Sequence, residues 1–339
     1  MTDVLTMGEM MLRLKPDGRE RVIQADTYAA NYGGAEANVA TSLALLGDSA
    51  AFFSKLPRNP LGDAALGTLR RYGVDVSRVL RGGDRLGIYF FEKGASVRAT
   101  SVVYDRANSA FAGLTAAECD WPTLLAGVRY FYFSGITAAL SEPIRAALLA
   151  GCRYCAAHGI AVICDTNYRG KMWSPALAQR EMAKLMPYVT VCIANDEDFE
   201  ATLGIEAFDG DMQNGIAQRE QFETAMRAVQ AQYPNIKAVA SVLRDIHSVE
   251  DSRWCALLVT GGKAYASPIY DMQVYEGVAG GDAFAAGLLH GMLNGLAPQQ
   301  QIDYAIAASV LKLTIPGDLN LVTDPEVRRV MTAGNSVDR

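Results

Sequence analysis

Two glycines and an acidic residue stand directly before an apolar, small-residue run at residues 278–287, which read Val-Ala-Gly-Gly-Asp-Ala-Phe-Ala-Ala-Gly. Glycines let the backbone turn tightly, and the start of a helix presents unpaired N–H groups to whatever lies there. Such a turn is suited to hold an anion, most often a phosphate. Asp282 would repel that phosphate unless it acts on a proton. The pattern therefore favours phosphoryl transfer, with Asp282 drawing the proton from an attacking hydroxyl.

The same residues can also be interpreted as an ordinary loop with an acidic N-cap. A cap of this kind stabilises a helix by about 1 kcal/mol, and short glycine motifs match many unrelated proteins. For this segment alone the two interpretations are equally good, so the rest of the chain has to separate them.

The elements that would position these residues alternate in the second part of the chain. From Arg129 onward, apolar runs of strand length are separated by segments of helix length, which predicts crossover connections and a parallel sheet covered on both faces. Ligand sites in such sheets gather at the carboxyl ends of the strands. Polar residues stand at those ends, at 134–135, 165–169 and 195–198. The predicted strands are 130–134, 161–165 and 189–194, and the helices between them include 142–158 and 175–186.

The first part of the chain holds a second glycine motif and a pair of alternating strands. Residues 33–38, Gly-Gly-Ala-Glu-Ala-Asn, open a helix that runs to Leu46. The segments 87–92 and 98–104 alternate and are rich in aromatic residues, with a turn at 93–96 between them. These few strands would be half exposed as a lone sheet, so we expect them to cover the active-site edge of the main domain.

Composition excludes several classes of protein. The 339 residues are 50% hydrophobic and 20% charged, as in an ordinary globular protein. The formal charge of −6, without basic patches, argues against a nucleic-acid or membrane-surface role. No run reaches membrane-spanning length or resembles a signal peptide. The six cysteines lack a disulfide spacing, and Cys152-Arg-Tyr-Cys155 falls in a helical pattern, where packing is favoured over redox or zinc chemistry. We therefore expect a reduced, cytoplasmic location.

Three ordered elements together resemble the ribokinase-like (PfkB) carbohydrate kinases. The run from Gly33 to Gly47 is similar to the sugar-binding signature of that family, and 279–282 is similar to its anion hole and catalytic aspartate. Between them, 195–198 is similar to its Asn-x-x-Glu element. The resemblance implies a three-layer α/β/α fold with a mostly parallel sheet and a small β-sheet lid. It implies one kinase domain over 1–339, with a discontinuous lid at about 9–32 and 84–107.

Within that family the chain resembles the 2-keto-3-deoxygluconate kinases most. The stretches that carry this resemblance are 104–110, 133–137 and 165–169, followed by Trp173. The resemblance implies a sugar-acid pocket lined by Gly33, Gly34, Asn38, Tyr89, Tyr104, Arg106, Ile136, Arg169 and Asp318.

The implied reaction is transfer of the ATP γ-phosphoryl to the terminal hydroxyl of 2-keto-3-deoxygluconate, which gives the 6-phosphate. Asp282 would be the base, and the N–H groups of Ala279, Gly280 and Gly281 would hold the charge on the transferring group. Mg²⁺ would be held mostly through water, near Asn195 and Asp198. The residues implied for the nucleotide are Asn167, Arg169, Asn195, Arg244, Gly280 and Gly281.

Arg106 would separate an acid from a neutral sugar, because a guanidinium can grip a carboxylate with two hydrogen bonds. Arg106 can also be interpreted as a surface residue at a strand end, and Arg169 could instead reach the nucleotide phosphates. A kinase of a neutral sugar or a nucleoside on the same fold therefore remains open, as does a non-catalytic sugar-binding relative.

The chain departs from the family pattern at a few positions. Ala279 replaces a glycine, and a positive φ there would cost about 1 kcal/mol. Asp198 replaces the usual Glu, and the segment 245–253 lacks the glycine turn expected near the phosphates. His290 has no partner cluster in the sequence, so a surface or core role is favoured over catalysis. The resemblance also implies association through the lid sheet, whose exposed strand edges and apolar faces invite pairing, so we expect a homo-oligomer with a dimer as the minimal unit.

Overall fold

The computed structural model describes residues 2–333 and contains a central sheet of nine strands in the order β14-β13-β12-β11-β10-β9-β1-β4, with β15 also paired to β13. The strands from β4 to β12 along this order run parallel, and β13 is antiparallel to its neighbours. The strands are β1 (Val4–Met7), β4 (Ala50–Phe53), β9 (Tyr130–Ser134), β10 (Ala161–Asp165), β11 (Val191–Ile193), β12 (Ala238–Ile246), β13 (Asp251–Thr260), β14 (Lys263–Ala266) and β15 (Tyr270–Gln273).

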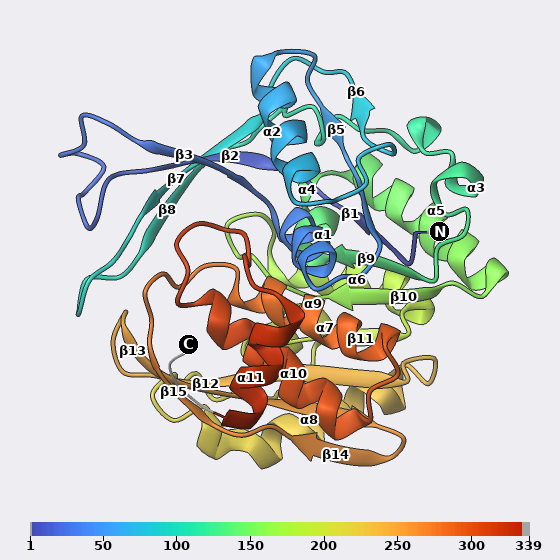
Figure 1. The fold of residues 1–339 in the computed structure, drawn as a ribbon. Helices are drawn as coiled ribbons and strands as arrows, with labels where there is room; N and C mark the ends of the chain where they lie inside the picture. The colour runs from blue at the N-terminus through green and yellow to red at the C-terminus, as the bar shows by residue number, and fades with distance from the viewer. Residues whose placement is uncertain (1, 334–339) are drawn as a thin grey trace.

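Helices cover both faces of this sheet (Figure 1). One face is covered by α1 (Ala35–Leu45), α2 (Pro60–Arg71), α9 (Gly280–Leu293) and α10 (Pro298–Lys312), and α11 (Asp324–Ala333) packs outside α10. The other is covered by α3 (Trp121–Leu124), α4 (Gly135–Leu140), α5 (Glu142–His158), α6 (Pro175–Leu185), α7 (Asp198–Leu203) and α8 (Arg219–Gln232). Short 3-10 helices lie at Ala116–Glu118, Met186–Tyr188 and Ile216–Gln218, and β5 (Lys55–Leu56) pairs with β6 (Leu80–Arg81).

Apolar residues on both faces of the strands create the two cores. On β9, Phe131 and Phe133 pack into the core beneath α3–α8, whereas Tyr132 packs into the core beneath α1 and α9. Successive side chains of a strand point to opposite faces, so a strand covered on both sides must be apolar at every position. This requirement explains why the predicted strands read as continuous apolar runs.

A second, four-stranded sheet extends away from the body (Figure 1). Its order is β3-β2-β7-β8, and the burial of β7 alternates along the strand, as the sequence pattern predicts. On its covered face, Met11, Tyr89 and Phe91 form a small apolar cluster. The strands are β2 (Met11–Lys15), β3 (Ala29–Gly33), β7 (Gly87–Glu92) and β8 (Ser101–Asp105). We call this sheet the lid sheet.

The predicted fold class is confirmed: a mixed α/β molecule with helices on both faces of a mostly parallel sheet and a small second sheet. Two predicted strands are wrong at their ends. The strand predicted at 98–104 begins at Ser101, because Arg98 pairs with Ala95 in a tight turn. The strand predicted at 189–194 is limited to Val191–Ile193, since Val189 caps the preceding 3-10 helix. The predicted domain range of 1–339 includes Met1 and 334–339, which lie outside the described residues.

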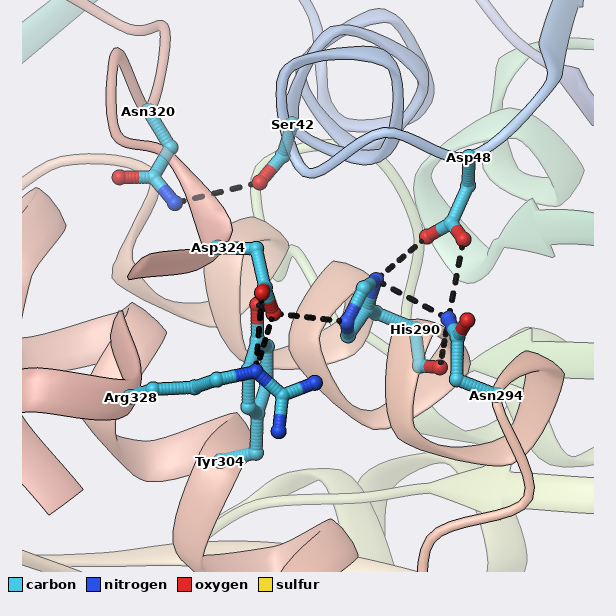
Figure 2. Close-up of polar contacts among 8 residues, drawn as sticks. All are labelled: Ser42, Asp48, His290, Asn294, Tyr304, Asn320, Asp324 and Arg328. Atoms are coloured by element: carbon cyan, nitrogen blue, oxygen red, sulfur yellow. Dashed lines mark hydrogen bonds and ion pairs between the residues drawn. The ribbon is translucent and has the colours of Figure 1, made fainter. Parts of the chain in front are cut away.

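A polar cluster around the buried His290 links α11 to the body (Figure 2). His290 from α9 stacks on Tyr304 of α10, with ring centroids 4.6 Å apart. Its Nδ1 lies 2.7 Å from Oδ2 of Asp48, and its Nε2 lies 3.2 Å from Oδ1 of Asp324. Arg328 donates from Nε to both oxygens of Asp324. His290 therefore has a core role, joining α9 to the turn before β4 and to α11.

Among the described residues, no helix is long and apolar enough to cross a membrane.

Candidate active site

A cavity of about 430 Å³ lies between the carboxyl ends of the parallel strands and the lid sheet, and brings together residues far apart in the sequence. Fifteen of the seventeen residues predicted for the site line this cavity, and Gly33 and Gly280 do not. The predicted residues that line it are Gly34, Asn38, Tyr89, Tyr104, Arg106, Ile136, Asn167, Arg169, Asn195, Asp198, Arg244, Ala279, Gly281, Asp282 and Asp318.

The candidate base stands at the start of α9. Asp282 is buried, and the side-chain amide of Asn38 donates to its Oδ2 at 2.7 Å. Burial raises the pKa of Asp282 to about 7, and nearby Glu36 adds to the rise, while the hydrogen bond from Asn38 and the charge of Arg169 oppose it. A carboxylate with this pKa can both accept and release a proton near neutral pH.

The turn before Asp282 has the positive φ at Ala279 whose cost the sequence analysis considers. Ala279 adopts φ +59° and ψ +15°, in the left-handed region, and its carbonyl oxygen accepts from the N–H of Ala283. Gly281 lines the cavity, whereas Gly280 is buried beneath it and its carbonyl oxygen accepts from Oγ of Ser309. A helix N-terminus therefore opens onto the cavity, with Asp282 in its first turn.

Asp198 and Asn195 join the ends of three neighbouring strands. The carboxylate of Asp198 accepts from the backbone N–H groups of Tyr168 at 2.7 Å and Asn195 at 3.0 Å. Oδ1 of Asn195 accepts from the N–H of Val242 on β12 at 2.7 Å. Burial raises the pKa of Asp198 to about 6, although the two backbone donors oppose the rise. Both residues line the cavity, and their oxygens already hold the loops in place.

Asp165, at the end of β10, is a cavity residue that the sequence analysis places only in a polar cluster. Its Oδ1 is buried without a hydrogen-bond partner among the described residues. Burial raises the pKa of Asp165 well above its usual value, and the nearby charges of Asp198 and Asp282 raise it further. An unpartnered carboxylate oxygen is the kind of ligand that Mg²⁺ prefers. Within residues 2–333, however, the structure contains no group of three or more His, Cys, Asp or Glu residues arranged to hold a metal ion.

Two arginines lie along the cavity beyond this cluster. Arg244 forms an ion pair with Asp196, and its guanidinium carbon lies 5.4 Å from the centroid of the Trp254 ring. Burial lowers the pKa of Arg244 to about 10, and the positive charge of Arg169 contributes. Nη1 of Arg169 donates to the carbonyl oxygen of Tyr168. In place of the expected glycine turn, Arg244 lies inside the long β12–β13 hairpin.

At the lid end of the cavity, Arg106 is already paired with a carboxylate. Its Nε donates to Oε2 of Glu9 at 2.8 Å, and its Nη2 contacts the same oxygen. Its Nη1 faces the sulfur of Met172 at 3.7 Å, which is a weak acceptor. Oε1 of Glu9 is buried without a hydrogen-bond partner among the described residues. The surface position considered for Arg106 is therefore wrong, because only 12% of its side chain is exposed.

Asp318 belongs to a buried network that also includes the lid sheet. The hydroxyl of Tyr89 donates to its Oδ1, and Nε of Arg13 lies 3.1 Å from its Oδ2. Nη2 of Arg13 donates to Glu276 at 2.7 Å. Gly33 acts next to this network rather than in the cavity: a Cβ there would lie 2.6 Å from the Cβ of Asp318, so only glycine permits the approach.

Glu36 supports the cavity wall that carries Ile136. Its Oε1 accepts from the N–H and the hydroxyl of Ser134 and from the hydroxyl of Thr137, at 2.6–2.9 Å. Burial raises the pKa of Glu36, although these hydrogen bonds oppose the rise. The Glu of the first glycine motif therefore fixes the turn at the end of β9.

Three charged residues at the site were not predicted from the sequence: Glu9, which lines the cavity, and Arg13 and Glu276, which belong to the network around Asp318. Each is a charged residue within or next to an apolar stretch, and Arg13 stands in the run Met-Met-Leu-Arg-Leu. A lone charge in such a run is costly to bury unless it is paired, so its position was a usable signal. Its partner could not be found in the same way, because Arg13 and Glu276 are 263 residues apart.

The chain belongs to the pfkB family of carbohydrate kinases, whose family model matches residues 1–324. The glycine turn, its aspartate and the lid-covered cavity described above thus belong to a carbohydrate kinase.

Among solved structures, a 2-dehydro-3-deoxygluconokinase from Thermotoga maritima is 41% identical to this chain, with a TM-score of 0.94, and the match covers 98% of this chain and 100% of that one. A 2-dehydro-3-deoxygalactonokinase from Haloferax volcanii is 33% identical over 340 residues, which is 99% of both chains. A 2-dehydro-3-deoxygluconokinase from Bacillus subtilis is 26% identical over 99% of this chain and 97% of the relative.

Proposed function

We propose that this carbohydrate kinase transfers the γ-phosphoryl group of ATP to the terminal hydroxyl of 2-dehydro-3-deoxygluconate, the sugar acid also called 2-keto-3-deoxygluconate, and so gives the 6-phosphate. The names of the relatives from Thermotoga maritima and Bacillus subtilis support this substrate. The observation that carries the proposal is the presence of Arg106 and Arg169 in the same cavity as Asp282. That arrangement offers positive charge for an acid group and a base for a hydroxyl.

In the proposed reaction, Asp282 accepts the proton of the terminal hydroxyl as that oxygen attacks the γ-phosphorus. The bond between the γ-phosphorus and the bridging oxygen breaks, and ADP leaves. The N–H groups at residues 279–281 hold the charge on the transferring group, because they belong to the start of a helix. Asn38 orients the base through its hydrogen bond to Oδ2.

The nucleotide is assigned to the part of the cavity with Asn167, Asn195 and Arg244, and the charge of Arg169 acts on both Arg244 and Asp282. Guanidinium groups suit phosphate oxygens, and Arg244 is held ready by Asp196 and Trp254. Mg²⁺, when bound with the nucleotide, neutralises phosphate charge. The unpartnered oxygen of Asp165 fits direct contact with such an ion, and Asn195 and Asp198 fit contact through water.

For the substrate carboxylate, we assign Nη1 of Arg106, the guanidinium nitrogen that Glu9 does not contact. Tyr89, Tyr104 and Asp318 line the same end of the cavity and supply groups for the hydroxyls of the sugar. The pairing of Arg106 with Glu9 also favours a second candidate function. Since Glu9 balances the charge of Arg106, this end of the cavity could accept a neutral sugar.

A substrate panel separates the two functions. ADP release is measured with ATP and Mg²⁺ on 2-dehydro-3-deoxygluconate, its galacto epimer, gluconate, fructose, ribose and adenosine. Turnover on the keto-deoxy acids alone is expected. Turnover on fructose or ribose alone would favour the neutral-sugar kinase, and saturable binding of a sugar without ADP release would favour the non-catalytic relative.

We further propose that the lid sheet closes over the sugar, and that the chain is a homo-oligomer, at least a dimer, which pairs through that sheet. The two outer strands, β3 and β8, have free edges within the described residues, and Val103 on β8 is 59% exposed. Light scattering tests the oligomer, and a monomer at working concentration would contradict it. The six free, buried cysteines and the use of ATP support a cytoplasmic location.

A further inference from the structure

Lys312, the last residue of α10, is a buried ammonium group that the proposed reaction leaves without a role. Its relative exposure is 0%, and its Nζ donates to the carbonyl oxygen of Ile315 at 2.9 Å. Lysine is almost never fully buried unless its charge is compensated. Val310 and Leu313, on either side of it in the sequence, belong to an apolar core, and a methionine would fill a similar volume without burying a charge. The charge therefore calls for a functional explanation.

The end of α10 supports the turn that holds the transferring group. The carbonyl oxygen of Leu313 accepts from the N–H groups of Tyr275 at 2.9 Å and Glu276 at 3.1 Å. One turn earlier, Oγ of Ser309 donates to the carbonyl oxygen of Gly280 at 2.9 Å. The carboxyl end of a helix carries a partial negative charge. Placed beneath an anion-binding turn, that end would disfavour a phosphate unless a positive charge offset it.

Lys312 supplies a positive charge at this place, and four charged groups face it from the surrounding elements. Asp318 and Glu276 favour its charged form, Arg13 of the lid strand β2 opposes it, and Asp282 of α9 favours it. Burial is the largest influence and lowers the pKa of Lys312 to about 8. Its hydrogen bond to Ile315 also shapes the loop that leads to Asp318.

We propose that Lys312 is a positioning residue for phosphoryl transfer. Its buried ammonium group holds the loops 275–281 and 313–318 together, and it keeps the electrostatic potential beneath the anion-binding turn positive. Lys312 acts through those loops and does not line the cavity. This inference rests on the proposed roles of Asp282 and the 279–281 turn. It goes beyond those roles because it makes the positive charge of Lys312 a requirement for turnover.

The test compares Lys312→Met, which keeps the volume, with Lys312→Gln, which keeps a donor for Ile315 but loses the charge. The exposed Lys263→Met is the matched control. Both Lys312 variants are expected to lower kcat for ATP and 2-dehydro-3-deoxygluconate about 10- to 100-fold, with a much smaller change in KM. Lys263→Met is expected to leave both constants unchanged.

The pH profile provides a readout that a merely structural role would not change. Turnover of the unaltered enzyme is expected to fall above about pH 8, as Lys312 loses its proton, and both Lys312 variants are expected to lack this alkaline decline. Unchanged kcat in Lys312→Gln, or an alkaline decline that persists in it, would overturn the proposal, even if Lys312→Met failed to fold. Asp282→Asn measured in parallel distinguishes a failed base assignment, because full activity in that variant would reject the proposed function alone.

Discussion

The protonation state of Asp282 depends on the burial of its carboxyl group. Because burial raises its pKa to about 7, the group is protonated below neutral pH and cannot then accept the proton of the substrate. We expect kcat/KM to rise with pH, about tenfold per unit below pH 7, and to level off between about pH 7 and pH 8, before the alkaline decline assigned to Lys312. Asn38→Ala removes the hydrogen bond that lowers this pKa, so the midpoint is expected to move to higher pH. A pH-independent rate between pH 5 and 7 would contradict the assignment of Asp282 as base.

Ala279 stores strain in the anion-binding turn. A left-handed alanine costs about 1 kcal/mol relative to glycine. Glycine, however, has more conformational freedom in the unfolded chain, and this offsets part of the stability gained by relieving the strain. Ala279→Gly is therefore expected to raise the free energy of unfolding by about 0.5 kcal/mol, with kcat equal or higher. Urea unfolding and initial rates measure both. A clear loss of stability would mean that the methyl group makes contacts that outweigh the strain.

Arg106 and Glu9 determine how strongly the cavity prefers an acid. Arg106→Ala is expected to raise KM for the keto-deoxy acid by at least about tenfold, since a charged hydrogen bond is worth about 1.5–3 kcal/mol. Glu9→Gln leaves the guanidinium charge unbalanced, and it is expected to change KM for acid substrates less than Arg106→Ala does. Initial rates at varied sugar concentration provide the comparison. Equal losses on an acid and on a neutral sugar would show that Arg106 is a structural partner of Glu9 and does not recognise a carboxylate.

At the scale of elements, β2 does more than form one strand of the lid sheet. Arg13 carries a buried charge from this strand to Glu276 and Asp318, and its guanidinium carbon lies 4.8 Å from the centroid of the Phe91 ring. Burial alone would raise the pKa of Glu276, but Arg13 and Lys15 hold it below its usual value. The orientation of the lid is thus coupled to the loop that precedes the anion-binding turn.

Breaking this network should be costly. Arg13→Met removes the guanidinium from two buried carboxylates, of which Glu276 keeps Lys15 and Asp318 keeps the hydroxyl of Tyr89. Removing one member of a buried pair typically costs about 3–5 kcal/mol. We expect a loss of this size in urea unfolding, together with a raised KM for the sugar. The exposed pair Arg227–Glu223 on α8 provides the control, since Arg227→Met should change stability by less than about 1 kcal/mol. Similar losses in the two variants would contradict the coupling.

The elements themselves were largely predictable, because their signals are local. A strand covered on both faces needs an apolar run, and 130–134 and 161–165 are observed as predicted. The replacement of a glycine by Ala279 marked this turn as a place where a positive φ would be costly, and the structure shows φ +59° there. The pairing of Arg106 with Glu9 was not, because 97 residues separate them and the pair forms only when the lid sheet meets β1. Burial and charge pairing are properties of the assembled site.

At the scale of the whole molecule, the chain surrounds one cavity with parts drawn from both ends. Residues near the N-terminus supply Glu9 and Arg13, and residues beyond 275 supply the turn, the base and Asp318. The cluster around His290 holds the carboxyl end of α9 to the body, and the first turn of the same helix carries Asp282 (Figure 2). Three sequence motifs located this cavity because each lies beside it at the end of a strand or helix. The buried residues that support these motifs do not belong to any comparable motif.

The most direct test of the central claim is the turnover of 2-dehydro-3-deoxygluconate by the unaltered enzyme and by Asp282→Asn, with ATP and Mg²⁺ at pH 7.5 and the product analysed by phosphorus NMR. We predict a phosphate ester on the terminal carbon and a loss of kcat of at least about a hundredfold in Asp282→Asn. A phosphorylated product formed at an undiminished rate by Asp282→Asn would contradict the account, as would the absence of any phosphorylated sugar acid from the unaltered enzyme.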